Sequence, residues 1–275
     1  AFAASTPGDA HHSIAASLVD GDAATILLGN LALGHPRLAD LRVLASTIAE
    51  LSGARFGYLP EAGNACGAWL AGAVPHRVAA GAPADRMGAT AAELWSSPKR
   101  GYLLMGVEPE ADACDPAAAV GGLQAAEAVV SVSAFTSDAM LQYANVILPA
   151  TTFAETDGTL VNAEGLWQNF DAAGSPPGDA RPTWKILRVL ANELGLDGFD
   201  YFAAGEVRRE LKEHCRELTL DNSTSAGKPV ESGTPRAGLV RFGDVPMYSV
   251  DPLTRRSQPL QEAADALFDK SPQSK

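Results

Sequence analysis

Five polar side chains of the kinds that act in acid–base catalysis or ligand binding lie close together in the middle of the chain. They are Glu155, Asp157, Asn162, Glu164 and Gln168. Paired carboxylates can act as general acid and base, and the amides could bind the polar edge of a purine in a dinucleotide-like ligand. Since Thr, Asp and Gly are also the residues with which chains make turns, the same stretch is equally consistent with a plain structural loop.

Several other chemistries are disfavoured by spacing. Cys66, Cys114 and Cys215 are far apart without a C-x-x-C pair, which argues against a zinc or iron–sulfur site and favours a reducing compartment. His214 adjoins Cys215, but neighbouring helical residues point apart. The sequence contains no G-x-S-x-G, H-E-x-x-H, G-x-G-x-x-G or P-loop pattern. A self-contained hydrolase or a standard nucleotide-binding fold is therefore not indicated.

Charge and hydropathy exclude further classes. The 275-residue chain has a formal charge of −12, whereas a nucleic-acid footprint needs clustered Lys and Arg. No apolar run approaches the roughly 20 residues that cross a bilayer. The sequence therefore predicts no nucleic-acid partner and no direct membrane insertion. The lack of an initiator Met favours a start inside a longer polypeptide.

The polar loop follows a predicted strand–helix–strand unit. Apolar, β-branched residues over 129–135 indicate a buried parallel strand, 139–144 a short helix, and 146–148 a second strand. Ligand-binding loops of parallel sheets lie at the carboxyl ends of such strands. Gly158 breaks the backbone within the loop, and we expect it to have a positive φ.

Strands and helices alternate through the first 170 residues. The expected strands cover 24–28, 55–59 and 102–105, and the expected helices cover 36–51, 89–95 and 116–126. Gly53 is the expected stop of the helix over 36–51. Thr183 is the expected cap of a later helix that Gly195 ends, and another helix is predicted over 207–218. This alternation predicts an α/β fold whose mostly parallel sheet has helices on both faces.

Two passages resemble the molybdopterin oxidoreductase superfamily, and a third resembles one particular member of it. The central run 144–168, ANVILPATTFAETDGTLVNAEGLWQ, is similar to its pattern A-D-V-V-L-P-x-x-x-x-E-x-x-G-T-x-x-N-x-E-G-R-x-Q. The run 60–75, PEAGNACGAWLAGAVP, resembles G-A-N-x-x-G-A-x-x-A-G-x-x-P, although close packing explains its glycines better than phosphate binding. The ending 246–261 resembles the pattern P-x-Y-x-x-D-P-L-x-R-R-x-x-x-L-Q of the large peripheral-arm subunit of bacterial NADH-quinone oxidoreductase, respiratory complex I.

Two departures from the superfamily pattern concern the cofactor site. Glu108 stands where the superfamily often has Asn near the pterin, and Leu166 stands where Arg usually follows Glu-Gly. Both remove favourable partners of a pyrophosphate. The resemblance therefore implies a vestigial cleft with Glu108, Asn162, Glu164 and Gln168 as candidate lining residues. We expect no catalytic residue, no metal and no bound molybdopterin in this chain.

The resemblance also implies an organisation. Residues 1–170 would form the Rossmann-like, molybdopterin-oxidoreductase-like domain, 171–219 a helical segment packed on it, and 220–275 a loop and irregular tail. The parent subunit would carry its iron–sulfur clusters N-terminal to this chain.

The implied function is structural. The chain would support electron transfer from NADH to quinone, coupled to proton translocation, on the cytoplasmic side of the bacterial inner membrane. Its partners would be other peripheral-arm subunits, with Arg255 and Arg256 as a docking point for a partner's carboxylates. Two alternatives stay open: a fragment of a formate dehydrogenase-like enzyme that binds a pterin dinucleotide, and an independent binding module without a redox role.

Overall fold

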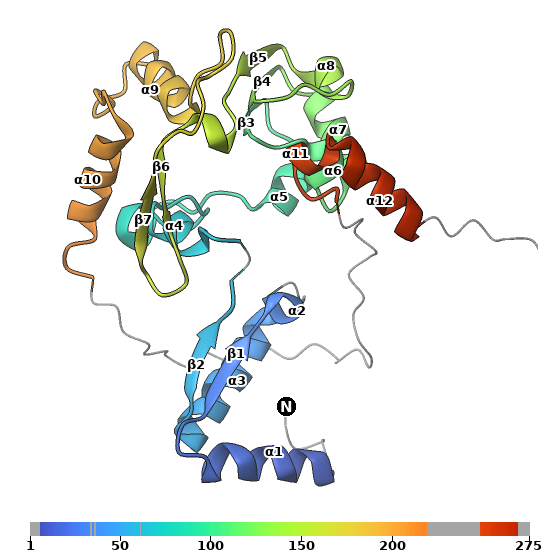
Figure 1. Cartoon of the computed structure of the whole chain (residues 1–275), viewed down its shortest axis with the longest axis vertical. Coiled ribbons are helices and arrows are strands. Elements are labelled where there is room, and N and C mark those ends of the chain that lie inside the picture. Colours follow the sequence, from blue (N-terminus) through green and yellow to red (C-terminus); the bar gives the residue numbers. More distant parts are fainter. Residues whose placement is uncertain (1–5, 34, 36, 61, 219–247, 269–275) are drawn as a thin grey trace, which may run out of the picture. The chain divides into compact units, whose positions relative to one another are not determined.

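The computed structural model describes residues 6–33, 35, 37–60, 62–218 and 248–268 (Figure 1). They fall into two compact units. The first comprises the described parts of Ala1–Trp69, Leu160–Gln168 and Arg216–Arg241, and the second those of Leu70–Thr159, Asn169–Cys215 and Phe242–Lys275. The division expected from sequence, at residues 170 and 219, stays a prediction.

The first unit is built around a two-stranded parallel sheet. Its elements are α1 (Asp9–Asp20), β1 (Thr25–Leu28), α2 (Asn30–Leu33), α3 (Leu38–Ser52), β2 (Arg55–Tyr58) and most of α4 (Ala65–Leu70). Ile26 of β1 pairs with Phe56 of β2, and Phe56 is buried in one cluster with Ala45 and Ala49 of α3. Gly53 has a φ of 74°, which confirms it as the left-handed residue that ends α3.

The second unit contains a three-stranded parallel sheet in the order β3-β4-β5. Its elements up to the sheet's end are η1 (Ala79–Gly81), α5 (Ala91–Ser96), β3 (Gly101–Met105), α6 (Pro109–Asp112), α7 (Pro116–Gln124), β4 (Ala128–Ser133), α8 (Met140–Tyr143) and β5 (Val146–Pro149). Helices connect successive strands, as parallel pairing requires. The predicted α/β class with parallel sheets flanked by helices is confirmed, and in the described residues the parallel strands form two sheets rather than one.

The core of the second unit lies around β4. Val129 is fully buried in a cluster with Leu104 of β3, Leu123 of α7, and Met140 and Tyr143 of α8. Ser131 and Val132 point to opposite faces of β4 and are both fully buried, so both faces of this strand are covered, which explains its largely apolar sequence. The strand–helix–strand unit predicted for this stretch is confirmed.

The rest of the second unit follows the sheet. Its elements are η2 (Phe153–Glu155), β6 (Gly158–Val161), β7 (Trp167–Phe170), α9 (Thr183–Glu193), α10 (Ala204–His214), α11 (Pro252–Arg255) and α12 (Gln258–Phe268), except that the loop-side ends of β6 and β7 belong to the first unit. Thr183 is the first residue of α9 and Pro182 is its N-cap, so the predicted threonine cap is wrong. Gly195, with a φ of 68°, follows α9 as expected.

The described part of the predicted irregular tail is helical. Asp251 accepts hydrogen bonds from the backbone N–H groups of Leu253 and Thr254, and Pro252 occupies the first position of α11. An aspartate cap followed by proline is a strong helix start. The predicted loop over 220–235 lies outside the described residues.

Gly158 does not have the expected backbone conformation. It lies in β6 and its φ is not positive, so that prediction is wrong. A Cβ atom at Gly158 would lie 2.5 Å from Cζ of Phe170 in β7. Glycine is required here because an aromatic ring packs against its Cα, a tertiary contact that the local sequence does not reveal.

Two glycines of the run 60–75 allow close packing, as interpreted from sequence, whereas a Cβ at Gly63 would meet nothing within 4 Å. A Cβ at Gly67 would lie 2.0 Å from Oδ1 of Asn64, and this oxygen accepts the backbone N–H of Val161 at 2.8 Å. Gly72 has a φ of 72° and lies against the backbone of Val78. Two of the motif passages, 60–75 and 144–168, are thus tied together through Asn64.

Candidate functional site

The carboxyl ends of β3, β4 and β5 form one edge of the sheet in the second unit. The chain leaves β3 at Gly106, whose φ is 62° and whose N–H donates to the carbonyl of Val132 at 2.8 Å. It then enters α6 with Glu108 as the N-cap residue and Pro109 at the first helical position. This turn places the Glu108 carboxylate at the edge where parallel sheets bind ligands.

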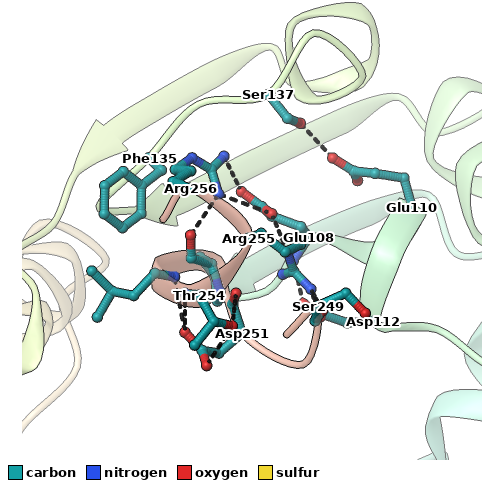
Figure 2. Close-up of polar contacts among 12 residues, drawn as sticks. Glu108, Glu110, Asp112, Phe135, Ser137, Ser249, Asp251, Thr254, Arg255 and Arg256 are labelled. Atoms are coloured by element: carbon teal, nitrogen blue, oxygen red, sulfur yellow. Dashed lines mark hydrogen bonds and ion pairs between the residues drawn. The ribbon is translucent and has the colours of Figure 1, made fainter. Parts of the chain in front are cut away.

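Glu108 is buried, with 3% of its surface exposed, and its carboxylate is paired with two arginines (Figure 2). Oε2 accepts from Nε of Arg255 at 3.0 Å and from Nη1 of Arg256 at 3.3 Å, while Oε1 accepts from Nη2 of Arg256 at 2.5 Å. A buried carboxylate is costly unless it is paired and hydrogen-bonded. The two guanidinium groups meet that requirement.

Asp112 gives Arg255 a second carboxylate. Its Oδ1 accepts from Nη1 of Arg255 at 2.8 Å, and its Oδ2 accepts the backbone N–H of Glu108 at 2.7 Å. Burial favours a neutral guanidinium, but the hydrogen bond with Asp112 and the charges of Asp112 and Glu108 outweigh it and raise the pKa of Arg255. Arg255 therefore stays charged, and it also donates to the carbonyl of Ser249 at 2.7 Å.

Arg256 extends the contact to the end of β4. Its guanidinium carbon lies 4.7 Å from the centre of the Phe135 ring, a cation–π distance, and Nη2 donates to the carbonyl of Thr136 at 3.1 Å. Figure 2 shows the guanidinium beside both the ring and the Glu108 carboxylate. A shallow pocket at this edge is lined by Ser133, Phe135 and Arg256, among others.

A third carboxylate, Glu110, belongs to a neighbouring network. It accepts hydrogen bonds from the hydroxyl of Ser137 and, at 3.0 Å, from that of Tyr143. Burial and the hydrogen bond to Glu110 raise the pKa of Tyr143, so the phenol stays protonated and donates. Glu110 thus joins α6 to α8 rather than facing a ligand.

This arrangement determines what the edge can do chemically. Glu108 and Asp112 are both committed to guanidinium groups of the same chain, which corrects the expectation that Arg255 and Arg256 dock on a partner's carboxylates. The sequence could not show this pairing, since Arg255 and Glu108 are 147 residues apart. The edge is acidic, and the guanidinium groups that neutralise it belong to Arg255, the last residue of α11, and to Arg256, which follows it.

The loop residues have structural contacts. Oδ1 of Asn162 accepts the backbone N–H groups of Glu164 and Leu166, at 3.0 and 2.9 Å, and so closes the loop between β6 and β7. Oε2 of Glu155 accepts the N–H of Thr152 at 2.9 Å, as a capping contact. The side chains of Glu164 and Gln168 are exposed, and Asp157 is half-buried.

The predicted site residues are divided between the units. Glu108 belongs to the second unit, whereas Asn162, Glu164 and Gln168 belong to the first, so their grouping in one cleft stays a prediction. Asp112 was missed from sequence, although its four-residue spacing from Glu108 places it one helical turn away. Within the described residues, no group of three or more His, Cys, Asp or Glu side chains is arranged to hold a metal ion.

Comparisons with known proteins identify relatives. The chain is 35% identical over 186 residues to the mitochondrial NADH dehydrogenase [ubiquinone] iron-sulfur protein 1 of Solanum tuberosum, covering 60% of this chain and 24% of that protein. It is 37% identical over 95 residues to the assimilatory nitrate reductase catalytic subunit of Bacillus subtilis, covering 34% of this chain and 13% of that protein. It is 42% identical over 69 residues to a protein of Staphylococcus aureus provisionally named a formate dehydrogenase, covering 25% of this chain and 7% of that protein.

The chain therefore spans a quarter or less of the length of these relatives. The sequence pattern of the molybdopterin oxidoreductases matches residues 9–193, well over half of the chain. That match includes both parallel sheets and the turn that bears Glu108. The chain belongs to the molybdopterin oxidoreductase family.

Proposed function

We propose that the chain is part of the iron–sulfur subunit of an NADH:quinone oxidoreductase and that it serves there as a scaffold without a redox centre of its own. The longest of the reported matches supports this assignment. It covers 186 residues of the NADH dehydrogenase relative, against 95 and 69 residues of the nitrate reductase and formate dehydrogenase relatives.

The buried Glu108 is the observation that carries the scaffold role. The cofactor that gives the family its name bears phosphate, and phosphate binding needs unpaired donors or cations. At the carboxyl ends of β3 and β4 a phosphate would instead meet a carboxylate that is 3% exposed, and the adjacent guanidinium groups already neutralise it. The residues present do not fit a phosphate-bearing cofactor at this edge.

A scaffold acts through the surfaces that its partners cover. In the second unit, Met87, Phe153 and Phe202 expose 74%, 72% and 83% of their surfaces. Large apolar side chains that are this exposed are natural anchors for other subunits. None of the helices in the described part of the chain has both the length and the apolar character needed to cross a membrane. We propose peripheral attachment to the inner membrane through partner subunits.

A second candidate is a molybdopterin-dependent enzyme of the formate dehydrogenase type. The higher identity of the shorter matches, 42% over 69 residues and 37% over 95, favours it. In that case Asn162, Glu164 and Gln168 would be the cofactor-site candidates, and the pterin would bind elsewhere than at Glu108.

The test is immunoprecipitation from gently solubilised membranes of the source cell, with antibody raised to this chain. NADH-dependent reduction of a soluble quinone in the precipitate is expected, and antibody pre-absorbed with the purified chain is the control. Formate- or nitrate-linked turnover of a viologen dye, without NADH–quinone activity, would refute the scaffold proposal in favour of the second candidate. Metal analysis of the same precipitate is an independent check, because stoichiometric molybdenum or tungsten in the parent would contradict a vestigial site.

A further inference from the structure

The carboxyl edge of the β3-β4-β5 sheet lies against the chain's own C-terminal segment, residues 248–261, which we call the clasp. We infer that this edge is a dedicated binding site for the clasp and that the clasp has replaced a phosphate-bearing ligand there. This inference deepens the proposed function. It rests on that function because it takes the edge to hold no redox cofactor.

Charge matching is the first support. The edge presents the carboxylates of Glu108 and Asp112, and the clasp presents the guanidinium groups of Arg255 and Arg256. Three ion pairs of 2.5 to 3.0 Å join them, and the side chains of Glu108 and Arg255 are only 4% and 13% exposed. Bidentate, buried pairs of this kind are specific in geometry. An anionic ligand would have to displace both arginines and would then face two carboxylates.

The clasp also covers apolar and backbone groups at the end of β4. The guanidinium of Arg256 lies against the Phe135 ring and donates a hydrogen bond to the carbonyl of Thr136. Phe135 and Thr136 come shortly after Ser133, the last residue of β4. These are the positions from which open parallel sheets contact their ligands. The clasp therefore uses the ligand-binding groups of the edge as well as its charges.

The clasp is preorganised for this role. Both Asp251 oxygens hold the start of α11, and Nε2 of Gln261 donates to the carbonyls of Tyr248 and Thr254 at 2.9 and 2.7 Å. The carbonyl of Pro252 accepts from Arg256 at 3.0 Å. A segment whose own hydrogen bonds fix its shape loses less entropy on docking. Figure 1 shows α11 beside α6, with α12 following α11.

One polar atom of the clasp lacks a partner. Nη2 of Arg255 is buried and makes no hydrogen bond within the described residues. A small anion or a water molecule could satisfy it. A binding test with phosphate compounds is therefore needed beside a test of docking.

The docking test compares hydrogen exchange in the full 275-residue chain and in the double variant Arg255→Ala/Arg256→Ala. Removing both cations leaves Glu108 buried without a counter-charge, so we expect amide exchange in peptides covering 133–137 and 248–261 to rise by about tenfold or more. The variant Arg255→Lys/Arg256→Lys retains the charge without the fork geometry and should give an intermediate increase.

Arg100→Ala is the matched control. Arg100 pairs with Glu127 through two hydrogen bonds of 2.8 and 2.7 Å near the amino ends of β3 and β4, but both side chains are exposed, by 87% and 64%. Exchange at the clasp should stay at the wild-type rate in this variant. If amide exchange in residues 133–137 and 248–261 also stays at the wild-type rate in the double alanine variant, the inference that the edge binds the clasp is refuted. If it unfolds globally, exchange also rises in the buried strand 129–132, and the lysine variant then decides the question.

The binding test uses a fluorescent guanosine diphosphate and inorganic pyrophosphate as probes. We expect no saturable binding to the wild-type chain up to about 1 mM. One-to-one binding that raises exchange in 248–261 would overturn the inference, because a ligand would then displace the clasp. Both tests use the isolated chain, so they can succeed or fail whatever activity the immunoprecipitate shows.

Discussion

Replacement of Gly158 by Val tests why this position is glycine. The new Cβ would lie 2.5 Å from Cζ, 2.9 Å from Cε1 and 3.3 Å from Cε2 of Phe170. Since carbon atoms prefer separations of about 3.5–4.0 Å, the ring must retreat by about 1 Å. Overpacking of this kind costs about 1–3 kcal/mol, and the strand preference of Val offsets only a few tenths to about 1 kcal/mol. We expect a net loss of about 1–2 kcal/mol in the free energy of unfolding.

The same Gly158→Val substitution is also made in a protein that carries Phe170→Ala. If the ring causes the whole penalty, Gly158→Val should be nearly neutral once Phe170 has been truncated, and the coupling energy between the two sites should exceed about 1 kcal/mol. A strained backbone at Gly158 would instead give the same cost in both backgrounds. The assay is urea unfolding followed by circular dichroism in all four proteins.

Gly101→Val is the control for glycine replacement in a strand. Gly101 begins β3, has no positive φ, and a Cβ there would meet only the carbonyl oxygen of Ala128 at 3.5 Å. Its effect should lie within about 0.5 kcal/mol of zero. Equal penalties for Gly158→Val with and without Phe170 would refute the steric explanation.

Three further predictions concern other parts of the chain. Hydrogen bonds from Thr254 and Leu253 lower the pKa of Asp251, so its carboxylate contributes stability above the unfolded-state pKa that is lost as pH falls through the folded-state pKa; Asp251→Asn should flatten the pH dependence of the thermal midpoint below about pH 5. Burial raises the pKa of Cys215, so at about pH 8 mass spectrometry should find it alkylated by iodoacetamide more slowly than the exposed Cys114. Gly67→Ala should lower the free energy of unfolding in urea by about 1–3 kcal/mol, because its Cβ would displace the side-chain carbonyl of Asn64.

Each of these has a result that contradicts it. A pH profile that is the same in wild type and Asp251→Asn would assign the acid sensitivity to other groups. Equal alkylation rates would show that Cys215 is not shielded. Gly63→Ala is the control for Gly67→Ala, since a Cβ at Gly63 meets nothing within 4 Å; equal costs for the two would remove the role of Asn64.

The sequence by itself determined the elements and the family. Runs of β-branched residues predicted β4 and β5, helical periodicity predicted α3 and α9, and glycines at 53 and 195 marked their ends. These features are local, because each depends on residues within a turn or two of one another. The motif passages indicated a molybdopterin oxidoreductase for the same reason, since each is continuous in the chain.

Only the tertiary structure decided the roles of single side chains. Glu108 stood out in sequence as a departure from a pattern, but its arginine partners lie at the other end of the chain. Gly158 was correctly singled out and wrongly explained, because the Phe170 ring, twelve positions away, decides its role. Ion pairs and steric contacts depend on distances of a few ångströms, and residues far apart in sequence come that close only once the chain has folded.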